Sequence, residues 1–209
     1  MDLFVLVLEL IGTVAFAASG AVMAVRKRMD IFGVCVLALT TAVGGGILRD
    51  LLLGVTPPST FRNPVYAGTA ALVSIIVFLR PVRRYLAGDH AAYHRTMLVM
   101  DSLGLGIFTV VGVSMAFAAQ PQGGVFLAVF LGVVTGVGGG VMRDVMAGET
   151  PFIFVKHVYA CASLAGALAC ALLWDAVGAA WAMLTGAALV VVIRLLSATF
   201  KWNLPRADG

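Results

Sequence analysis

Long apolar runs separated by short polar segments are the main pattern along this chain of 209 residues. Most runs are close to the roughly 20 residues that cross a bilayer as an α-helix. The ranges of the seven spans that we expect are 3–25, 31–53, 64–80, 97–119, 124–147, 155–173 and 177–199. The pattern therefore predicts an all-α membrane protein that forms one transmembrane domain over residues 1–209.

The spans fall into two similar halves. The segment TAVGGGILRDLLLGVTP, which begins at Thr41, matches TGVGGGVMRDVMAGETP, which begins at Thr135, 94 residues later. The repeats cover 3–80 and 97–173, and the helix over 177–199 stands outside them. Because each repeat holds three spans, the second must enter the membrane from the opposite side. The arrangement is an inverted 3+3 repeat plus one extra helix, which is typical of transporters and channels.

Each half contains three consecutive glycines inside an apolar run. Glycine costs about 1 kcal/mol relative to alanine in a helix interior, so a triplet favours a kink or an unwound turn. Irregular backbone at membrane depth persists only inside protein or beside a watery cavity. We expect the second and fifth helices to be kinked at these glycines and to line an ion pathway; close helix packing is the alternative role. The candidate pathway residues are Thr41, Gly44, Gly45, Gly46, Thr135, Gly138, Gly139 and Gly140.

An Arg-Asp pair follows each glycine triplet. Ionisable residues inside a membrane usually have a partner, but adjacent residues on a helix point about 100° apart, so the Arg and Asp need not pair with each other. The repeat offers other partners. Glu9 lies near the start of the first span, on the side of the membrane where the second span ends with Arg49. Asp101 likewise lies near the start of the fourth span, on the side where the fifth span ends with Arg143. We expect a contact between the members of each of these two pairs.

The repeat contains further polar residues besides these two pairs. If the arginines pair as above, Asp50 and Asp144 remain as charges near opposite mouths of the pathway. The alternative is that the Arg-Asp residues anchor helix ends at the membrane interface. Tyr66 and Tyr159 begin equivalent helices, and we expect them to lie in the belt of aromatic residues at the interface.

The composition supports a membrane protein and excludes several other classes. Hydrophobic residues make up 61% of the chain and charged residues 11%, whereas soluble domains carry about a quarter charged residues. The formal charge of +4 comes from basic residues between apolar runs, so we do not expect nucleic-acid binding. His90 and His94 stand four residues apart in a polar loop without further ligands, and we expect no metal site. The chain also lacks P-loop, GxSxG and HExxH motifs, so we expect neither an enzyme nor a cofactor.

The distribution of Lys and Arg predicts the orientation in the membrane. Basic residues are concentrated on one side of the predicted spans: Arg26, Lys27, Arg28, Arg80, Arg83, Arg84, Arg95, Lys156, Lys201 and Arg206. The positive-inside rule places that side in the cytoplasm, with the N-terminus outside and the C-terminus inside. Because the first basic cluster follows the first apolar run, we expect a retained span rather than a cleaved signal peptide. The expected location is the cell (inner) membrane.

The motif GGGxxRD near the end of the second span, repeated near the end of the fifth, resembles the bacterial branch of the trimeric intracellular cation channels. Bacterial members are also classed as a glycine-transporter domain family. The resemblance covers nearly the whole chain and implies a homotrimer with one pore per protomer, lined by the kinked second and fifth helices. It implies potassium, and less readily sodium, as permeating ions, with membrane lipid as a further partner. The segment MLVMDSLGLG lacks the basic motif that engages phosphoinositide in animal members.

We therefore expect a passive monovalent cation channel that prefers potassium. Backbone carbonyls and threonine hydroxyls can replace part of an ion's hydration shell, and the mouth carboxylates can attract cations. The rival is a secondary transporter of a small zwitterion such as glycine, whose carboxylate would be held by half-helix N-termini. Transport should saturate and discriminate among amino acids, whereas a channel should give unitary currents.

Overall fold

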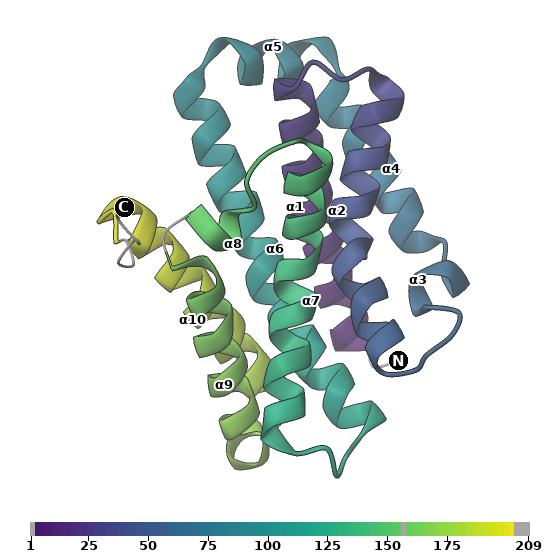
Figure 1. Cartoon of the computed structure of the whole chain (residues 1–209), viewed down its shortest axis with the longest axis vertical. Coiled ribbons are helices and arrows are strands. Elements are labelled where there is room, and N and C mark those ends of the chain that lie inside the picture. Colours follow the sequence, from purple (N-terminus) through teal and green to yellow (C-terminus); the bar gives the residue numbers. More distant parts are fainter. Residues whose placement is uncertain (1–2, 156–157, 203–209) are drawn as a thin grey trace.

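The computed structural model describes residues 3–155 and 158–202, and those residues form helices joined by short loops, with no strand among them (Figure 1). The helices are α1 (Leu3–Arg26), α2 (Ile31–Leu52), α3 (Ser59–Arg62), α4 (Val65–Phe78), α5 (Arg80–Gly88), α6 (His90–Ala119), α7 (Gly124–Met146), α8 (Phe152–Val155), α9 (Tyr159–Val177) and α10 (Ala179–Thr199). Six of them are long and apolar enough to cross a membrane. A seventh span is added if α4 and part of α5, which meet at 73°, count as one. The predicted all-α membrane fold is confirmed.

Most helix bounds agree with the predicted spans. Helices α1, α2, α7 and α10 begin and end within two residues of expectation. Helix α9 begins and ends four residues later than the predicted sixth span, and residues 156–157, near the expected start of that span, lie outside the described residues. The basic residues Lys156 and Arg206, which contributed to the predicted orientation, also lie outside them.

Helix α6 begins seven residues before the predicted fourth span. The side chain of Asp89 accepts a hydrogen bond of 2.7 Å from the backbone N–H of Ala91 and thereby caps the helix. An aspartate cap satisfies one of the free N–H groups at a helix start, so the polar segment after it can be helical. The expectation that His90 and His94 lie in a loop is therefore wrong.

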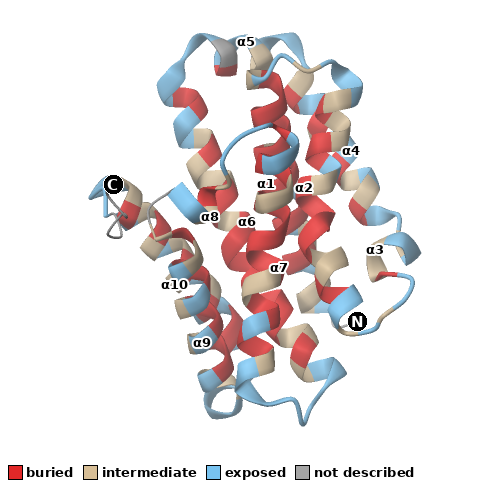
Figure 2. Cartoon of the chain, in the orientation of Figure 1, coloured by how far each residue is buried: buried red, intermediate tan, exposed pale blue. Residues whose placement is uncertain are grey.

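The buried core lies where α1, α2, α6 and α7 pack together (Figure 2). Helix α1 packs against α2 and α6, and α7 packs against α6 and α2. Helices α4 and α9 cover this core from outside, and α10 packs against α6 and α9. Phe16 of α1 and Phe108 of α6 occupy equivalent positions of the repeat, and their ring centroids lie 5.3 Å apart at the centre. The two repeats therefore meet through their equivalent helices.

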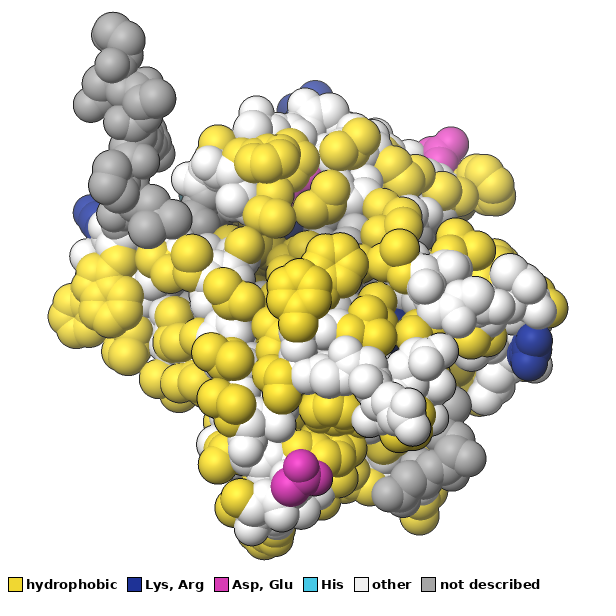
Figure 3. All heavy atoms as spheres, turned by 60° about the horizontal axis from the view of Figure 1, so that its bottom comes forward, with side chains coloured by type: hydrophobic (Ala, Val, Ile, Leu, Met, Phe, Trp, Pro, Cys, Tyr) yellow, Lys and Arg dark blue, Asp and Glu magenta, His cyan; other side chains and the backbone are white. Residues whose placement is uncertain are grey.

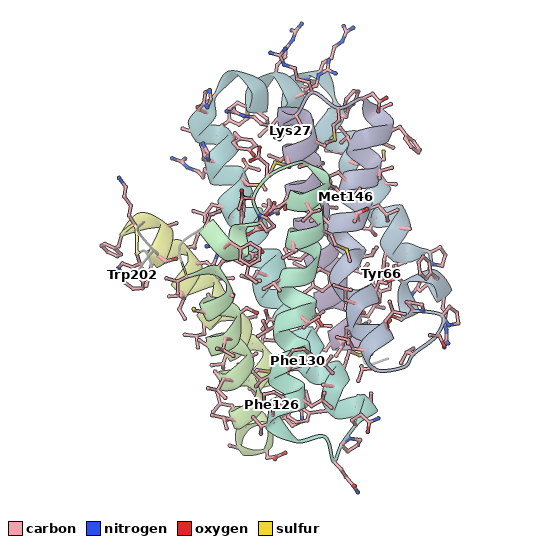
Figure 4. All side chains as sticks on the ribbon, viewed as in Figure 1. Lys27, Tyr66, Phe126, Phe130, Met146 and Trp202 are labelled. Atoms are coloured by element: carbon pink, nitrogen blue, oxygen red, sulfur yellow. The ribbon has the colours of Figure 1, made fainter. Side chains whose placement is uncertain are left out.

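The outer surface is largely hydrophobic, as a bilayer requires. Figure 3 brings the end opposite α5 forward and shows hydrophobic side chains over most of that face, with only isolated charged ones. Figure 4 places Lys27 at the same end as α5, and Phe126 and Phe130 at the opposite end. Phe126 is 84% exposed, which is costly in water and favourable against lipid.

Candidate functional site

Helices α2 and α7 cross through their glycine triplets. A Cβ atom added at Gly45 would clash with the carbonyl oxygen of Thr135, and one added at Gly139 would clash with the carbonyl oxygen of Thr41. A Cβ at Gly138 would lie 3.1 Å from the Cα of Gly45. The backbones of the two helices are therefore in direct contact, which only glycine allows.

Both glycine triplets are helical. Helix α2 runs without interruption through Gly44–Gly46, and α7 does so through Gly138–Gly140. The alternative of an unwound turn is therefore wrong, because a backbone in apolar surroundings has no better partners than its own helical hydrogen bonds. A kink in the axis of either helix stays a prediction.

The threonines beside the triplets are fully buried and bonded within their own helices. The hydroxyl of Thr41 donates to the carbonyl of Leu37 at 2.6 Å, and the hydroxyl of Thr135 donates to that of Leu131 at 2.6 Å. In this conformation both hydroxyl hydrogens therefore form hydrogen bonds with backbone carbonyls. A role of these oxygens in an ion pathway stays a prediction.

Four buried residues form the first-repeat cluster: Glu9, Arg49, Asp50 and Tyr66. The Nη1 atom of Arg49 lies 3.7 Å from Oε1 of Glu9, and its Nη2 atom lies 2.8 Å from Oδ1 of Asp50. The hydroxyl of Tyr66 donates a hydrogen bond to Oε2 of Glu9. One arginine thus bridges two carboxylates, and a tyrosine fixes one of them.

The equivalent positions form the second-repeat cluster: Asp101, Arg143, Asp144 and Tyr159. The Nη1 atom of Arg143 lies 2.6 Å from Oδ1 of Asp101, and its Nη2 atom lies 2.8 Å from Oδ1 of Asp144. The hydroxyl of Tyr159 donates to Oδ1 of Asp101 over 3.4 Å. In both clusters the structure brings the arginine to the carboxylate on the first helix of its own repeat.

Asp50 and Asp144 do not stand free at pathway mouths. Besides its arginine, each accepts a hydrogen bond from the first residue of the short helix that follows: Ser59 N–H donates to Asp50 Oδ2 at 2.7 Å, and Phe152 N–H donates to Asp144 Oδ2 at 2.8 Å. Both aspartates are buried, with at most 1% of each residue exposed. The expectation of free mouth charges is therefore wrong, because a buried carboxylate needs partners for its oxygens.

The two tyrosines also differ from expectation. Tyr66 and Tyr159 are 6% and 2% exposed, and both hydroxyls point to carboxylates in the core. The interfacial role predicted for them is wrong. The recurrence of Val-Tyr-Ala in the two repeats marks them as equivalent, but the sequence alone does not say which way the side chains point.

A small cavity adjoins the first-repeat cluster. Its volume is about 20 Å³, which is room for about one water molecule. Polar groups from several helices contribute to its wall, among them Glu9, Thr13, Ser59 and Thr60, and Phe108 also lines it. The cavity is therefore lined both by the first-repeat cluster and by the aromatic core.

The second-repeat cluster is enclosed by other groups. The guanidinium of Arg143 lies 4.8 Å from the ring centroid of Phe152, which takes the place that Ser59 has in the first repeat. The Nη1 atom of Arg143 also donates to the hydroxyl of Ser19 on α1, at 2.6 Å. An aromatic ring and a helix of the other repeat thus cover this arginine.

Helix α10 adds a second arginine to the second-repeat cluster. The Nη2 atom of Arg194 lies 3.7 Å from Oδ2 of Asp101, and its guanidinium lies 4.7 Å from the ring centroid of Tyr159. Arg194 is 2% exposed. Helix α10 stands outside the repeat, so the symmetry that predicts the Glu9–Arg49 and Asp101–Arg143 pairs says nothing about Arg194.

The helices and the two charged clusters define an inverted-repeat, multi-pass membrane protein, and comparison with known proteins places it in a family. A family model described as glycine transporter matches residues 6–81 and again residues 98–175. A UPF0126 membrane protein of Deinococcus radiodurans is 41% identical over 202 residues, which cover 95% of this chain and 89% of that protein.

Solved structures of TRIC cation channels are similar throughout. One, determined to explain conductance through these channels, has a TM-score of 0.84 at 37% identity and covers 97% of both chains. The orthologue from Rhodobacter sphaeroides has a TM-score of 0.84 at 33% identity and covers 95% of this chain and 98% of its own. The chain belongs to the bacterial branch of the trimeric intracellular cation channel family.

Proposed function

We propose that this protein is a passive channel for monovalent cations, with a pathway between α2 and α7 in each protomer. The observation that carries the proposal is the crossing of these helices through bare backbone at Gly45 and Gly139. Apart from Met142, which packs over Gly44, and Leu48, which packs over Gly138, the contact at the triplets is backbone against backbone, so few side chains must repack when the helices part. A buried threonine borders each triplet, and a charged cluster follows it.

The described conformation is closed at this crossing. The two backbones touch at the glycines, and the Phe16 and Phe108 rings pack beside them. Conduction therefore requires α2 and α7 to separate, which would expose the carbonyl and hydroxyl oxygens of Thr41 and Thr135 to an ion. The paired carboxylates neutralise Arg49 and Arg143, whose charges would otherwise repel a cation.

The family relationship supports the finer features of the proposal. The similar solved structures are those of TRIC cation channels, whose name describes a trimer. We therefore propose that this protein forms a homotrimer, prefers potassium over sodium, and is inserted in the cell (inner) membrane. The basic residues of the α1–α2 connection and of α5 then face the cytoplasm, with the N-terminus outside and the C-terminus inside.

A secondary transporter of a small zwitterion such as glycine is the second candidate. The description of the matching family model as a glycine transporter favours it, and an inverted repeat suits transporters as well as channels. The two candidates differ in kinetics, because a transporter saturates and a channel gives unitary currents.

Recordings from purified protein in planar bilayers test the proposal directly. We expect unitary currents that reverse near the potassium equilibrium potential in a potassium chloride gradient. Proteoliposomes of the same preparation should show no saturable uptake of labelled glycine. Saturable uptake without unitary currents would overturn the channel proposal in favour of the transporter.

Substitution of one crossing glycine tests the location of the pathway. In Gly45→Ala, the added methyl overpacks the closed crossing by about 1–3 kcal/mol, so the open probability should rise about tenfold. Gly68→Ala in α4 is the matched control, because a Cβ there meets nothing within 4 Å. An unchanged or lower open probability in folded Gly45→Ala, relative to Gly68→Ala, would exclude a gate at the α2–α7 crossing.

A further inference from the structure

A basic hollow lies at the elbow where α4 turns into α5. Helix α4 ends at Phe78, α5 begins at Arg80, and the two meet at 73°. The hollow has a volume of about 310 Å³. Its lining residues come from the end of α1, the α1–α2 connection, the end of α4 and α5: Val25, Arg28, Met29, Phe78, Arg83 and Arg84.

The three arginines of the hollow have no acidic partner in the described part of the chain. Within residues 3–155 and 158–202, no carboxylate oxygen lies within 4.0 Å of the guanidinium groups of Arg28, Arg83 and Arg84. The two nearest acidic residues along the chain are engaged in helix caps, Asp30 at α2 and Asp89 at α6. The hollow therefore presents an uncompensated triple positive charge, which suits an anion with several oxygens.

The rest of the wall is apolar and helps to fix the charge. The guanidinium of Arg83 lies 4.8 Å from the ring centroid of Phe78, a cation–π distance that holds it at the edge of the hollow. Val25 and Met29 contribute further apolar surface. A purely inorganic anion would leave this surface in water, whereas an amphiphile would cover it.

Helix α5 has the character of a helix that lies along a membrane surface. Its Val82 and Leu86 pack toward the core, while Arg83 and Arg84 occupy other positions on the same short helix. Because α5 bends by 73° from the apolar α4, it runs roughly in the plane of the membrane if α4 crosses it. The hollow is then at the depth of lipid headgroups.

An exposed apolar face of α4 continues from the elbow. Leu72, Ile75, Ile76 and Leu79 are all about half exposed or more. An acyl chain whose headgroup occupied the hollow could follow this face into the bilayer, and its burial there would be favourable. This continuity favours a lipid over free phosphate.

We propose that the hollow binds the headgroup of an anionic glycerophospholipid. Arg28, Arg83 and Arg84 pair with the phosphate oxygens, and Phe78 and Met29 contact the glycerol and the first methylenes. The site is independent of the proposed channel activity, since it lies on the lipid-facing elbow and shares no residue with the α2–α7 crossing.

Native mass spectrometry of the purified protein with phosphatidylglycerol and phosphatidylcholine of identical chains tests this proposal. The wild type should retain phosphatidylglycerol preferentially. Each basic residue near an anionic lipid strengthens binding roughly fivefold, so the double variant Arg83→Gln/Arg84→Gln should weaken it about 30-fold. Arg28→Asn is a second variant; Arg28 has a φ of 57°, a left-handed conformation that asparagine tolerates, and its loss should weaken binding about fivefold.

The matched control removes equal charge at the same end of the molecule. Arg80→Gln/Arg95→Gln changes two exposed arginines outside the hollow and should keep the lipid preference. Equal loss in this control would show diffuse attraction and overturn the site, as would full retention by the folded hollow variants. Displacement of phosphatidylglycerol by equimolar inorganic phosphate would show an anion site without lipid specificity, and the lipid assignment would then be wrong.

Discussion

The two charged clusters come from equivalent positions of the repeat, yet their surroundings differ. The first-repeat cluster borders a cavity of about 20 Å³ with hydroxyl groups in its wall, whereas Phe152 and Ser19 cover Arg143 in the second. With all carboxylates ionised, the first carries two negative charges and one positive, and the second, with Arg194, carries two of each. The same motif thus forms one hydratable and one enclosed site, depending on what packs against it.

This difference assigns different tasks to the two ends in the proposed channel. The first-repeat end already has room for a water molecule beside a cluster with two carboxyl groups and one arginine. The second-repeat end has two carboxyl groups and two arginines, one of them on a helix that belongs to neither repeat. We expect the enclosed end to present the larger barrier to an ion.

The largest expected effect comes from removing the central arginine of each cluster. Arg143→Met leaves two buried carboxylates without their main partner and should lower the free energy of unfolding by about 3–5 kcal/mol. Arg49→Met should cost less, about 1–3 kcal/mol, because water in the adjacent cavity can solvate the carboxylates. Unfolding of purified protein by SDS in mixed micelles measures both values. If both variants lost the same free energy of unfolding, the cavity beside the first-repeat cluster would not reduce the cost of removing its arginine.

Removing the arginine of α10 should make the second cluster resemble the first in charge. Arg194→Met removes the positive charge that lies 3.7 Å from Oδ2 of Asp101 but leaves Arg143 and Tyr159 in place. It should lower the free energy of unfolding by about 1–3 kcal/mol, less than the roughly 3–5 kcal/mol typical when a buried ion pair loses its only partner. Arg194→Lys keeps the charge and should recover part of the loss in the same SDS titration. If both variants were as stable as wild type, α10 would not hold this cluster.

Substitution of the tyrosines should destabilise the protein more in the first-repeat cluster than in the second, the reverse of the order expected for the arginines. Tyr66 makes a close hydrogen bond to Glu9, whereas Tyr159 reaches Asp101 over 3.4 Å. Tyr66→Phe should therefore cost about 1.5–2 kcal/mol and Tyr159→Phe below about 1 kcal/mol. A double-mutant cycle of Tyr66→Phe with Glu9→Gln would isolate the first value, and a coupling near zero would contradict it.

The smallest effect should come from the exposed link between the repeats. Lys27 and Glu149 form an ion pair whose side chains are 33% and 47% exposed. Lys27→Gln should change the free energy of unfolding by less than about 1 kcal/mol, and salt should abolish the difference. If Lys27→Gln lowered the free energy of unfolding as much as Arg49→Met, the exposed ion pair would stabilise the protein as strongly as a buried cluster, and the prediction would be wrong.

Several features follow from the sequence alone. Apolar run length predicts the spans, because the bilayer thickness sets the length of a helix that crosses it. The duplicated motif predicts the inverted repeat. Counting the spans places Glu9 at the same end of the helix bundle as Arg49, and Asp101 at the same end as Arg143. These are properties of a one-dimensional pattern, so they need no knowledge of how the helices pack.

Other features depend on packing between distant parts of the chain. Asp50 and Asp144 anchor short helices, Tyr66 and Tyr159 point inward, and Arg194 joins Asp101. In each case burial removes water, so a polar group must take whichever partner the neighbouring helices bring within reach. The sequence by itself determined the spans and their symmetry; the tertiary structure decided the partners, because desolvation makes pairing obligatory but leaves its choice to packing.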